Sequence, residues 1–83
     1  MRIYYFSWLR QIIGKDVEDV ELPTTITNAA EVMDYISSLS KDHEKAFLAR
    51  EPIQMAIDKH YAKPEQSIKD AKEIAFFPPV TGG

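Results

Sequence analysis

The chain begins and ends with aromatic-rich segments that favour β-strands. Residues 2–9 read RIYYFSWL, and residues 73–77 read EIAFF. The first segment is largely apolar on both of its faces, which is unusual for an antiparallel strand that keeps one face in water. We therefore expect the first and last strands to pair in parallel at the centre of a sheet, where apolar neighbours surround both.

One clear helix is predicted between these strands, over about residues 28–40. Thr27-Asn28 can cap its first turn, where the helix dipole also favours the acidic Glu31. Apolar residues then recur at helical spacing along one face, at Ala29, Val32, Met33, Ile36 and Leu39. We expect this face to pack on the sheet.

Shorter elements account for most of the remaining chain. The patterns predict a helical turn over residues 9–13 with Gly14 as its stop, and a short second helix within residues 41–50. Further strands are predicted at residues 17–22, 53–57 and 61–63. This order indicates an α+β fold in which one main helix crosses a mixed sheet. A ferredoxin-like arrangement fits the order less well, because it needs two long helices.

The residue types present exclude several classes of site. The chain has 83 residues, which suits one domain, and it contains no cysteine. Disulfide scaffolds, thiolate metal sites and thiol catalysis are therefore excluded. The two histidines, His43 and His60, are far apart in the sequence. We expect both to be exposed and inert, and we expect no metal site.

Charge and hydropathy limit the partners of the chain. The net charge is −3 and there is no basic stripe, so we expect no nucleic-acid partner. The longest apolar run is far below the roughly 20 residues of a membrane span, and no signal peptide is visible. We therefore expect a cytosolic protein that does not bind membranes. A solvated edge is predicted for four clustered acids, Asp16, Glu18, Asp19 and Glu21.

Strand parity predicts an aromatic surface on the outer face of the sheet. Neighbours in a strand face opposite ways, so Phe77 lies outside if Ile74 and Phe76 face the helix. The same parity places Ile3 and Tyr5 inside. We expect an association surface formed by Tyr4, Phe6 and Phe77, with Tyr61 beside them. Two alternatives stay open: the aromatics are scattered singly, or the segment 41–50 covers this face.

The last six residues predict a stiff stem that ends in a slim carboxylate. Pro78 and Pro79 stop the strand and favour the polyproline II form. Val80 and Thr81 favour extension, and Gly82-Gly83 have no side chains. Six extended residues reach roughly 20 Å. Such an end suits entry into a narrow channel of another protein; the alternative is a frayed terminus or an artificial remnant.

The end of the chain, FFPPVTGG over residues 76–83, resembles the C-terminus of the small, sulfur-carrying subunits of molybdopterin synthase. The segment from Ile3 to Gly14 resembles the aromatic first strand, arginine-bearing turn and glycine of that family. Ala56-Ile57-Asp58 resembles its third strand region. The chain departs from the family at Asp58, where Asn is frequent, and at Ala71-Lys72, which replaces a glycine-containing turn.

The resemblance implies a ubiquitin-like β-grasp domain over residues 1–77 and a flexible tail over residues 78–83. It implies that an ATP-using activating enzyme adenylates the carboxylate of Gly83, which then becomes a thiocarboxylate. The large catalytic subunit would receive the tail formed by Pro78, Pro79, Val80, Thr81 and Gly82. Sulfur would then pass to cyclic pyranopterin monophosphate within a heterotetramer. The chain itself would bind no cofactor and would not be an enzyme alone.

Two other readings of the chain stay open. A different ubiquitin-like carrier or modifier would serve thiamine synthesis, tRNA thiolation or protein conjugation, but such proteins usually lack the FFPPVT segment. In the other reading, the chain is a plain binding domain and its tail is inert. If the chain is instead a small synthase subunit, we expect the large subunit to dock on the outer aromatic surface that strand parity predicts, at Phe77, Phe6, Tyr4 and Tyr61.

Overall fold

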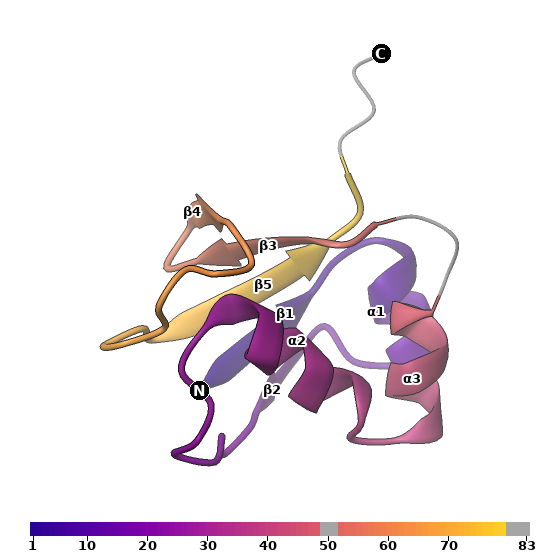
Figure 1. Cartoon of the computed structure of the whole chain (residues 1–83). Helices are drawn as coiled ribbons and strands as arrows, with labels where there is room; N and C mark the ends of the chain where they lie inside the picture. The colour runs from indigo at the N-terminus through magenta and orange to yellow at the C-terminus, as the bar shows by residue number, and fades with distance from the viewer. Residues whose placement is uncertain (49–51, 80–83) are drawn as a thin grey trace.

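The computed structural model describes residues 1–48 and 52–79, and these ranges form one mixed sheet with helices on one side. The strand order is β2-β1-β5-β3-β4, and only the central pair, β1 and β5, is parallel among the described strands (Figure 1). The strands are β1 (Arg2–Tyr5), β2 (Val17–Asp19), β3 (Gln54–Ile57), β4 (His60–Ala62) and β5 (Glu73–Phe77). The predicted α+β class and parallel central pair are confirmed.

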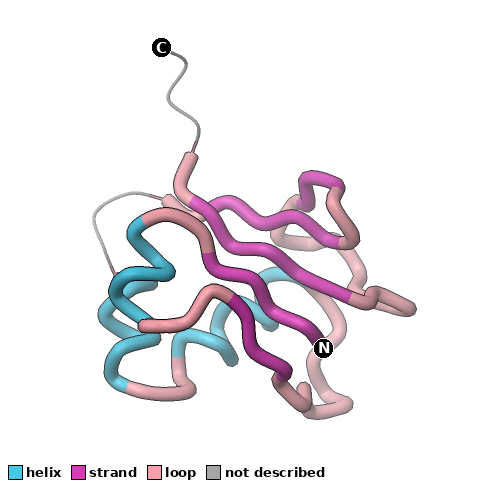
Figure 2. The backbone as a smooth tube through the Cα atoms, turned by 180° about the vertical axis from the view of Figure 1, so that it is seen from behind, coloured by secondary structure: helices cyan, strands magenta, loops and turns pink. Residues whose placement is uncertain are grey.

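The helices share one side of the sheet. They are α1 (Trp8–Ile13), α2 (Ala29–Ser37) and α3 (Lys41–Phe47). In Figure 1, α2 lies across the sheet, and α1 and α3 lie side by side near the end where β5 stops. Figure 2 shows the opposite face, over which no helix of the described residues passes. The sheet therefore keeps one face free for other contacts.

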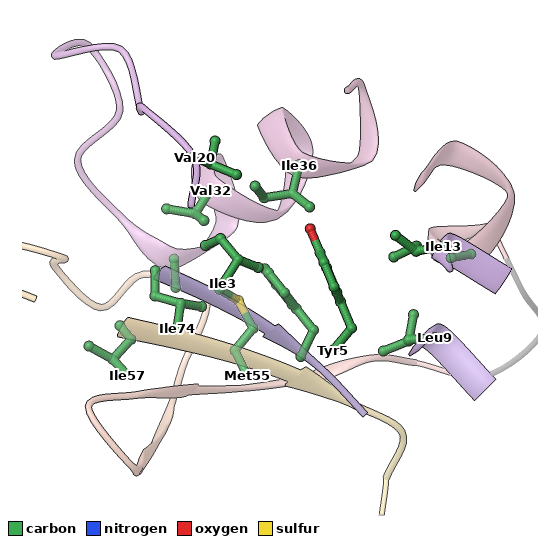
Figure 3. Close-up of a cluster of buried hydrophobic side chains, with 13 residues drawn as sticks. Ile3, Tyr5, Leu9, Ile13, Val20, Val32, Ile36, Met55, Ile57 and Ile74 are labelled. Atoms are coloured by element: carbon green, nitrogen blue, oxygen red, sulfur yellow. The ribbon is translucent and has the colours of Figure 1, made fainter. Parts of the chain in front are cut away.

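The core lies between the sheet and the helices. On the central strands, Ile3 and Tyr5 of β1 and Ile74 and Phe76 of β5 are at most 1% exposed, which confirms the predicted parity. The ring of Phe76 packs on Tyr5 and meets Phe47 of α3 edge-on, with centroids 6.3 and 5.0 Å apart. Figure 3 shows other side chains that converge there, from Leu9, Ile13, Val20, Val32, Ile36, Met55 and Ile57.

Local chemistry sets the ends of the helices. Asn28 caps α2 through a capping box: its side chain accepts the N–H of Glu31, whose carboxylate accepts the N–H of Asn28. Gly14 ends α1 with a φ of 85°, a conformation that costs a residue with a side chain more than it costs glycine. Both termini match the predictions from the sequence.

Several predicted boundaries were too long. The strand predicted at residues 2–9 ends at Tyr5, because Ser7 has a φ of 59° and Trp8 begins α1. The strand predicted at 17–22 ends at Asp19, and the helix predicted at 28–40 ends at Ser37. The packing predicted for Leu39 is wrong: it lies beyond the last turn of α2 and is 38% exposed.

The turn that departs from the family pattern uses aspartate. Asp70, and not Ala71, has a positive φ, of 64°. Asp58, with a φ of 47°, accepts the backbone N–H groups of Glu73 and Lys72 on its carboxylate at 2.9 Å each. These two hydrogen bonds lower the pKa of Asp58. The β3–β4 turn is thereby tied to the start of β5.

Candidate partner-docking face

The open face of the sheet carries a row of register partners from four neighbouring strands. Tyr4 of β1 pairs with Ala75 of β5, Ala75 with Ala56 of β3, and Ala56 with Tyr61 of β4. Because these residues are register partners, their side chains share one face. The row therefore reads tyrosine, alanine, alanine, tyrosine across the sheet.

The aromatic side chains predicted for this face lie on it as two pairs. Tyr4 stacks with Phe6 at a centroid distance of 6.4 Å, and Tyr61 meets Phe77 edge-on at 5.6 Å. Phe6 is 48% and Tyr61 is 72% exposed. The alternative in which residues 41–50 cover the face is wrong for the described part of that segment, since Ala46 is buried in the core and Phe47 packs on Phe76. The docking role of the four aromatics stays a prediction.

A shallow hollow lies beside the first aromatic pair. Its volume is about 290 Å³, and its lining residues are Tyr4, Phe6, Ala56, Lys59, Glu73 and Ala75. This hollow is not among the features predicted from the sequence. A signal was available, since two alanines interrupt strands that are otherwise built from larger residues, and alanine is depleted in strands.

The tail leaves the sheet beside this face. Phe77 is the last residue of β5, and Pro78 and Pro79 follow it outside any strand. Proline has no backbone N–H, so neither residue can donate to the sheet ladder. The remaining predicted tail residues, Val80, Thr81, Gly82 and Gly83, lie outside the described residues.

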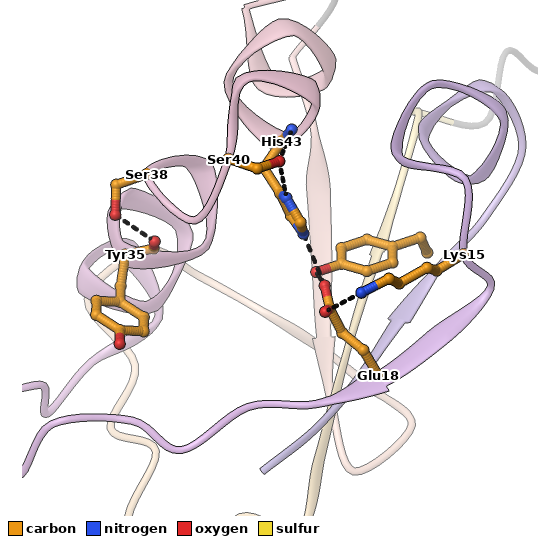
Figure 4. Close-up of polar contacts among 7 residues, drawn as sticks. Lys15, Glu18, Tyr35, Ser38, Ser40 and His43 are labelled. Carbon is orange, nitrogen blue, oxygen red and sulfur yellow. Dashed lines mark hydrogen bonds and ion pairs between the residues drawn. The ribbon is translucent and has the colours of Figure 1, made fainter.

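A buried polar network lies on the helix side of the sheet. The Glu18 carboxylate accepts hydrogen bonds from the Tyr5 hydroxyl at 2.6 Å, from His43 Nε2 at 2.7 Å and from Lys15 Nζ at 3.2 Å. Ser40, which caps α3, lies 2.6 Å from His43 Nδ1 (Figure 4). The network joins β1, β2 and α3.

The network corrects two predictions from the sequence. His43 is neither exposed nor free of contacts, because it is 6% exposed and bonded at both ring nitrogens. Glu18 is not part of a solvated edge, since its side chain is 15% exposed. Asp16, Asp19, Glu21 and His60 are exposed as expected. The network links distant parts of the chain and has no local signature that would have shown it.

Burial and hydrogen bonding oppose each other in this network. Burial raises the pKa of Glu18, but the hydrogen bonds from Tyr5, His43 and Lys15 outweigh it and leave the pKa below its usual value. Burial, and then the hydrogen bond to Glu18, raise the pKa of the Tyr5 hydroxyl well above its ordinary value. Among the described residues, every buried side-chain nitrogen or oxygen has a hydrogen-bond partner. The network is therefore a satisfied structural element.

A metal-binding cluster and a membrane-spanning helix are both absent from the described part of the chain. Residues 1–48 and 52–79 contain no group of three or more histidine, cysteine or acidic side chains placed to hold a metal ion. No helix in those ranges is long and apolar enough to cross a bilayer. The docking face and the tail are thus the features from which a function can be argued.

Residues 3–83 match the ThiS family. The chain belongs to this family. Two relatives carry the name molybdopterin synthase sulfur carrier subunit. The Haemophilus influenzae protein is 30% identical, and the comparison covers 100% of this chain and 99% of that protein. The Escherichia coli protein is 26% identical, with the same coverage of both chains.

Solved structures confirm the fold of this ThiS family member. A structure from Pyrococcus furiosus superposes with a TM-score of 0.75 at 27% identity and covers 95% of both chains. SAMP1 from Haloferax volcanii gives a TM-score of 0.77 at 19% identity and covers 100% of this chain and 98% of that one, a likeness of fold alone. The resemblance noted in the sequence and the ubiquitin-like β-grasp fold are confirmed.

Proposed function

We propose that this protein is the sulfur-carrying small subunit of a molybdopterin synthase. The observation that carries the proposal is the match, over nearly the whole of both chains, to relatives with that name. The C-terminal FFPPVTGG segment supports it independently, because its last two residues have no side chains and would present a slim carboxylate.

The reactive group in this proposal is the carboxylate of Gly83. A carboxylate is a poor electrophile. In the activating enzyme a carboxylate oxygen attacks the α-phosphorus of ATP, and pyrophosphate leaves. A sulfide sulfur then attacks the acyl carbon and AMP leaves, which produces the thiocarboxylate directly. If the donor is a persulfide, the product is an acyl disulfide, and a thiol must reduce its S–S bond to release the thiocarboxylate.

The sulfur of the thiocarboxylate is the nucleophile that attacks cyclic pyranopterin monophosphate. Water then hydrolyses the acyl–sulfur bond, which leaves the sulfur on the pterin and returns Gly83 to a carboxylate. Two carriers supply the two sulfurs of the dithiolene.

The proposal assigns the rest of the chain to recognition. The large catalytic subunit would dock on Phe77, Phe6, Tyr4 and Tyr61 and receive residues 78–83 in its own site. The open sheet face suits this role, because the aromatic pairs lie beside the point at which Pro78 leaves the sheet. No side chain of this protein takes part in the chemistry, so it binds no cofactor and is not an enzyme alone. We place the reaction in the cytoplasm.

A second candidate function is that of a different sulfur carrier or ubiquitin-like modifier. The match to the ThiS family as a whole supports it, because the match does not separate the carriers of one pathway from those of another. Such a carrier would serve thiamine synthesis, tRNA thiolation or protein conjugation. Its first step, adenylation of the terminal glycine, would be the same.

Two successive measurements separate these functions. The protein is incubated with an activating enzyme, ATP and a sulfur donor, and intact-mass spectrometry detects the replacement of one oxygen by sulfur. The product is then mixed with a large synthase subunit and cyclic pyranopterin monophosphate, and molybdopterin is measured. We expect both steps to succeed. Thiocarboxylate without molybdopterin would favour the second candidate, and no thiocarboxylate would contradict both.

A further inference from the structure

The two alanines at the centre of the open face form the floor of a hollow that the Tyr4–Phe6 pair bounds on one side. Ala75 and Ala56 are register partners on β5 and β3, and each is half-buried. The Tyr4–Phe6 pair lines the hollow on the β1 side, whereas Phe77 of β5 and Tyr61 of β4 form the second pair on the same face and are not among the lining residues. Because an alanine side chain ends at Cβ, the hollow of about 290 Å³ opens above this floor.

The lining of the hollow selects an apolar occupant. Methyl groups and aromatic rings cannot replace the hydration of a charged group, so burying one there is costly. Two of the described lining residues are charged, Lys59 and Glu73, and their charges are opposite. A large apolar side chain would instead gain from leaving water and from contact with the rings.

The exposure of the two aromatic pairs selects a macromolecular source for that side chain. Phe6 and Tyr61 are 48% and 72% exposed, and Tyr61 does not line the hollow. A small molecule seated on the two alanines would leave most of Tyr61 in water. A protein surface that covers both aromatic pairs would bury them and deliver a side chain to the alanine floor beside the Tyr4–Phe6 pair. The tail begins immediately after Phe77, so a protein that takes the tail also lies against this face.

We propose that Ala75 and Ala56 are specificity-determining residues for docking, because the space above them receives one large apolar side chain of the large synthase subunit. This inference rests on the proposed function. It adds that binding depends on space at the two alanines as well as on the aromatics around them. Filling the space from within should therefore prevent docking although it removes no contact.

The test is a pair of alanine-to-leucine substitutions on opposite sides of the sheet. Ala75→Leu fills the proposed site. Ala30→Leu is the matched control, because Ala30 lines a hollow of about 340 Å³ between α2 and the β3–β4 edge, on the helix side. Affinity for the large subunit is measured by titration calorimetry with the full chain. We expect Ala75→Leu to weaken binding at least tenfold and Ala30→Leu to change it less than threefold.

A second measurement keeps the proposal testable if Ala75→Leu does not fold. The wild-type chain is labelled with ¹³C at alanine methyl groups and bound to the unlabelled large subunit. We expect intermolecular nuclear Overhauser effects between the methyl groups of Ala75 and Ala56 and one apolar side chain of the partner. If neither methyl group shows an intermolecular nuclear Overhauser effect in a saturated complex, the proposal is overturned.

The outcomes separate this proposal from the proposed function. If the wild-type chain does not bind the large subunit, the proposed function fails. If the wild type binds, Phe77→Ala weakens binding and a folded Ala75→Leu binds as the wild type does, only the alanine site is overturned. The remaining possible occupant is a second copy of this chain, which analytical ultracentrifugation of the free chain tests. If the free chain is a dimer, Ala75→Leu makes it a monomer and binding to the large subunit is unchanged, the site serves self-association and the proposal is overturned.

Discussion

At the scale of single residues, adjacent side chains of β5 serve opposite purposes. Phe76 is fully buried and touches the rings of Tyr5 and Phe47. Phe77 is half-buried on the open face beside Tyr61. One step along a strand reverses the direction of the side chain, so the pair reports on the core and on the docking face separately.

Phe76→Ala and Phe77→Ala are therefore expected to have opposite effects. Phe76→Ala should lower the free energy of unfolding by about 3–5 kcal/mol, because it leaves a cavity in the core. Phe77→Ala should change thermal stability little but weaken binding to the large subunit roughly tenfold or more, as hot-spot aromatics do. Denaturant unfolding and titration calorimetry on both variants check this. The reverse assignment would contradict the docking role of the outer face.

The Glu18 network is expected to make stability depend on pH. The pKa of Glu18 is lowered in the folded state, so its contribution is full above its usual value of 4.5. That contribution is lost as the pH falls through the lower, folded pKa. Glu18→Gln should therefore flatten the loss of unfolding free energy in acid relative to the wild type. Chemical denaturation between neutral pH and about pH 3 measures the difference.

The control for this prediction is Asp16→Asn, immediately before β2. Asp16 is exposed and its side chain does not line the network. The Asp16 variant should keep the acid dependence of the wild type, because it retains Glu18 and the hydrogen bonds to its carboxylate. Equal slopes for the wild type and Glu18→Gln would mean that the network contributes nothing in a pH-dependent way.

The contrast between Phe77 and Glu18 shows what the sequence could predict at this scale. Parity along a strand depends only on neighbouring residues, so the inward and outward faces of β1 and β5 could be assigned. The partners of Glu18 are 13 and 25 residues away, at Tyr5 and His43. Nothing in the spacing of these residues indicates that the fold joins them. The sequence alone therefore predicts a solvated Glu18 and an exposed His43.

At the scale of elements, α2 packs on the core through a narrow stripe of apolar side chains. Val32 and Ile36 are fully buried, whereas Met33 is half-buried against the same cluster. The helical period and the capping residues Thr27-Asn28 made this helix predictable. Leu39 continued the same period, but the helix ends at Ser37, and a side chain beyond the last turn no longer follows the stripe.

Truncating the stripe should destabilise the domain. Ile36 has no exposed surface, so Ile36→Ala should reduce the free energy of unfolding by roughly 2–5 kcal/mol. Leu39→Ala is the comparison within the same segment, and it should cost clearly less because Leu39 is 38% exposed. Equilibrium urea unfolding measures both variants. A loss below about 0.5 kcal/mol for Ile36→Ala would show that α2 does not form part of the core.

At the scale of the whole molecule, packing and partner contact are assigned to different sides of the sheet. The helices and the Glu18 network occupy one side, and the aromatic pairs and the alanine floor occupy the other. The first and last strands meet in parallel at the centre, so the segment that leads to the tail begins on the most firmly held strand. This central pairing was predictable from the aromatic content of both ends of the chain. The hollow above Ala75 was not, because its size depends on how far side chains of β1, β3 and β5 and of the β3–β4 turn stand apart.

This separation predicts that the tail can be altered without harm to the fold. Adding one residue after Gly83 should abolish sulfur transfer, because the carboxylate that would be adenylated is displaced. The extended chain should keep the melting temperature of the wild type, since the added residue follows Gly83 in the sequence, after β5 and its core contacts. If the added residue is joined through a protease site that ends at Gly83, cleavage should restore both the thiocarboxylate mass and molybdopterin formation. Full activity of the uncleaved, intact-mass-verified extension would contradict the role of Gly83, whereas a lowered melting temperature would show that the tail supports the domain.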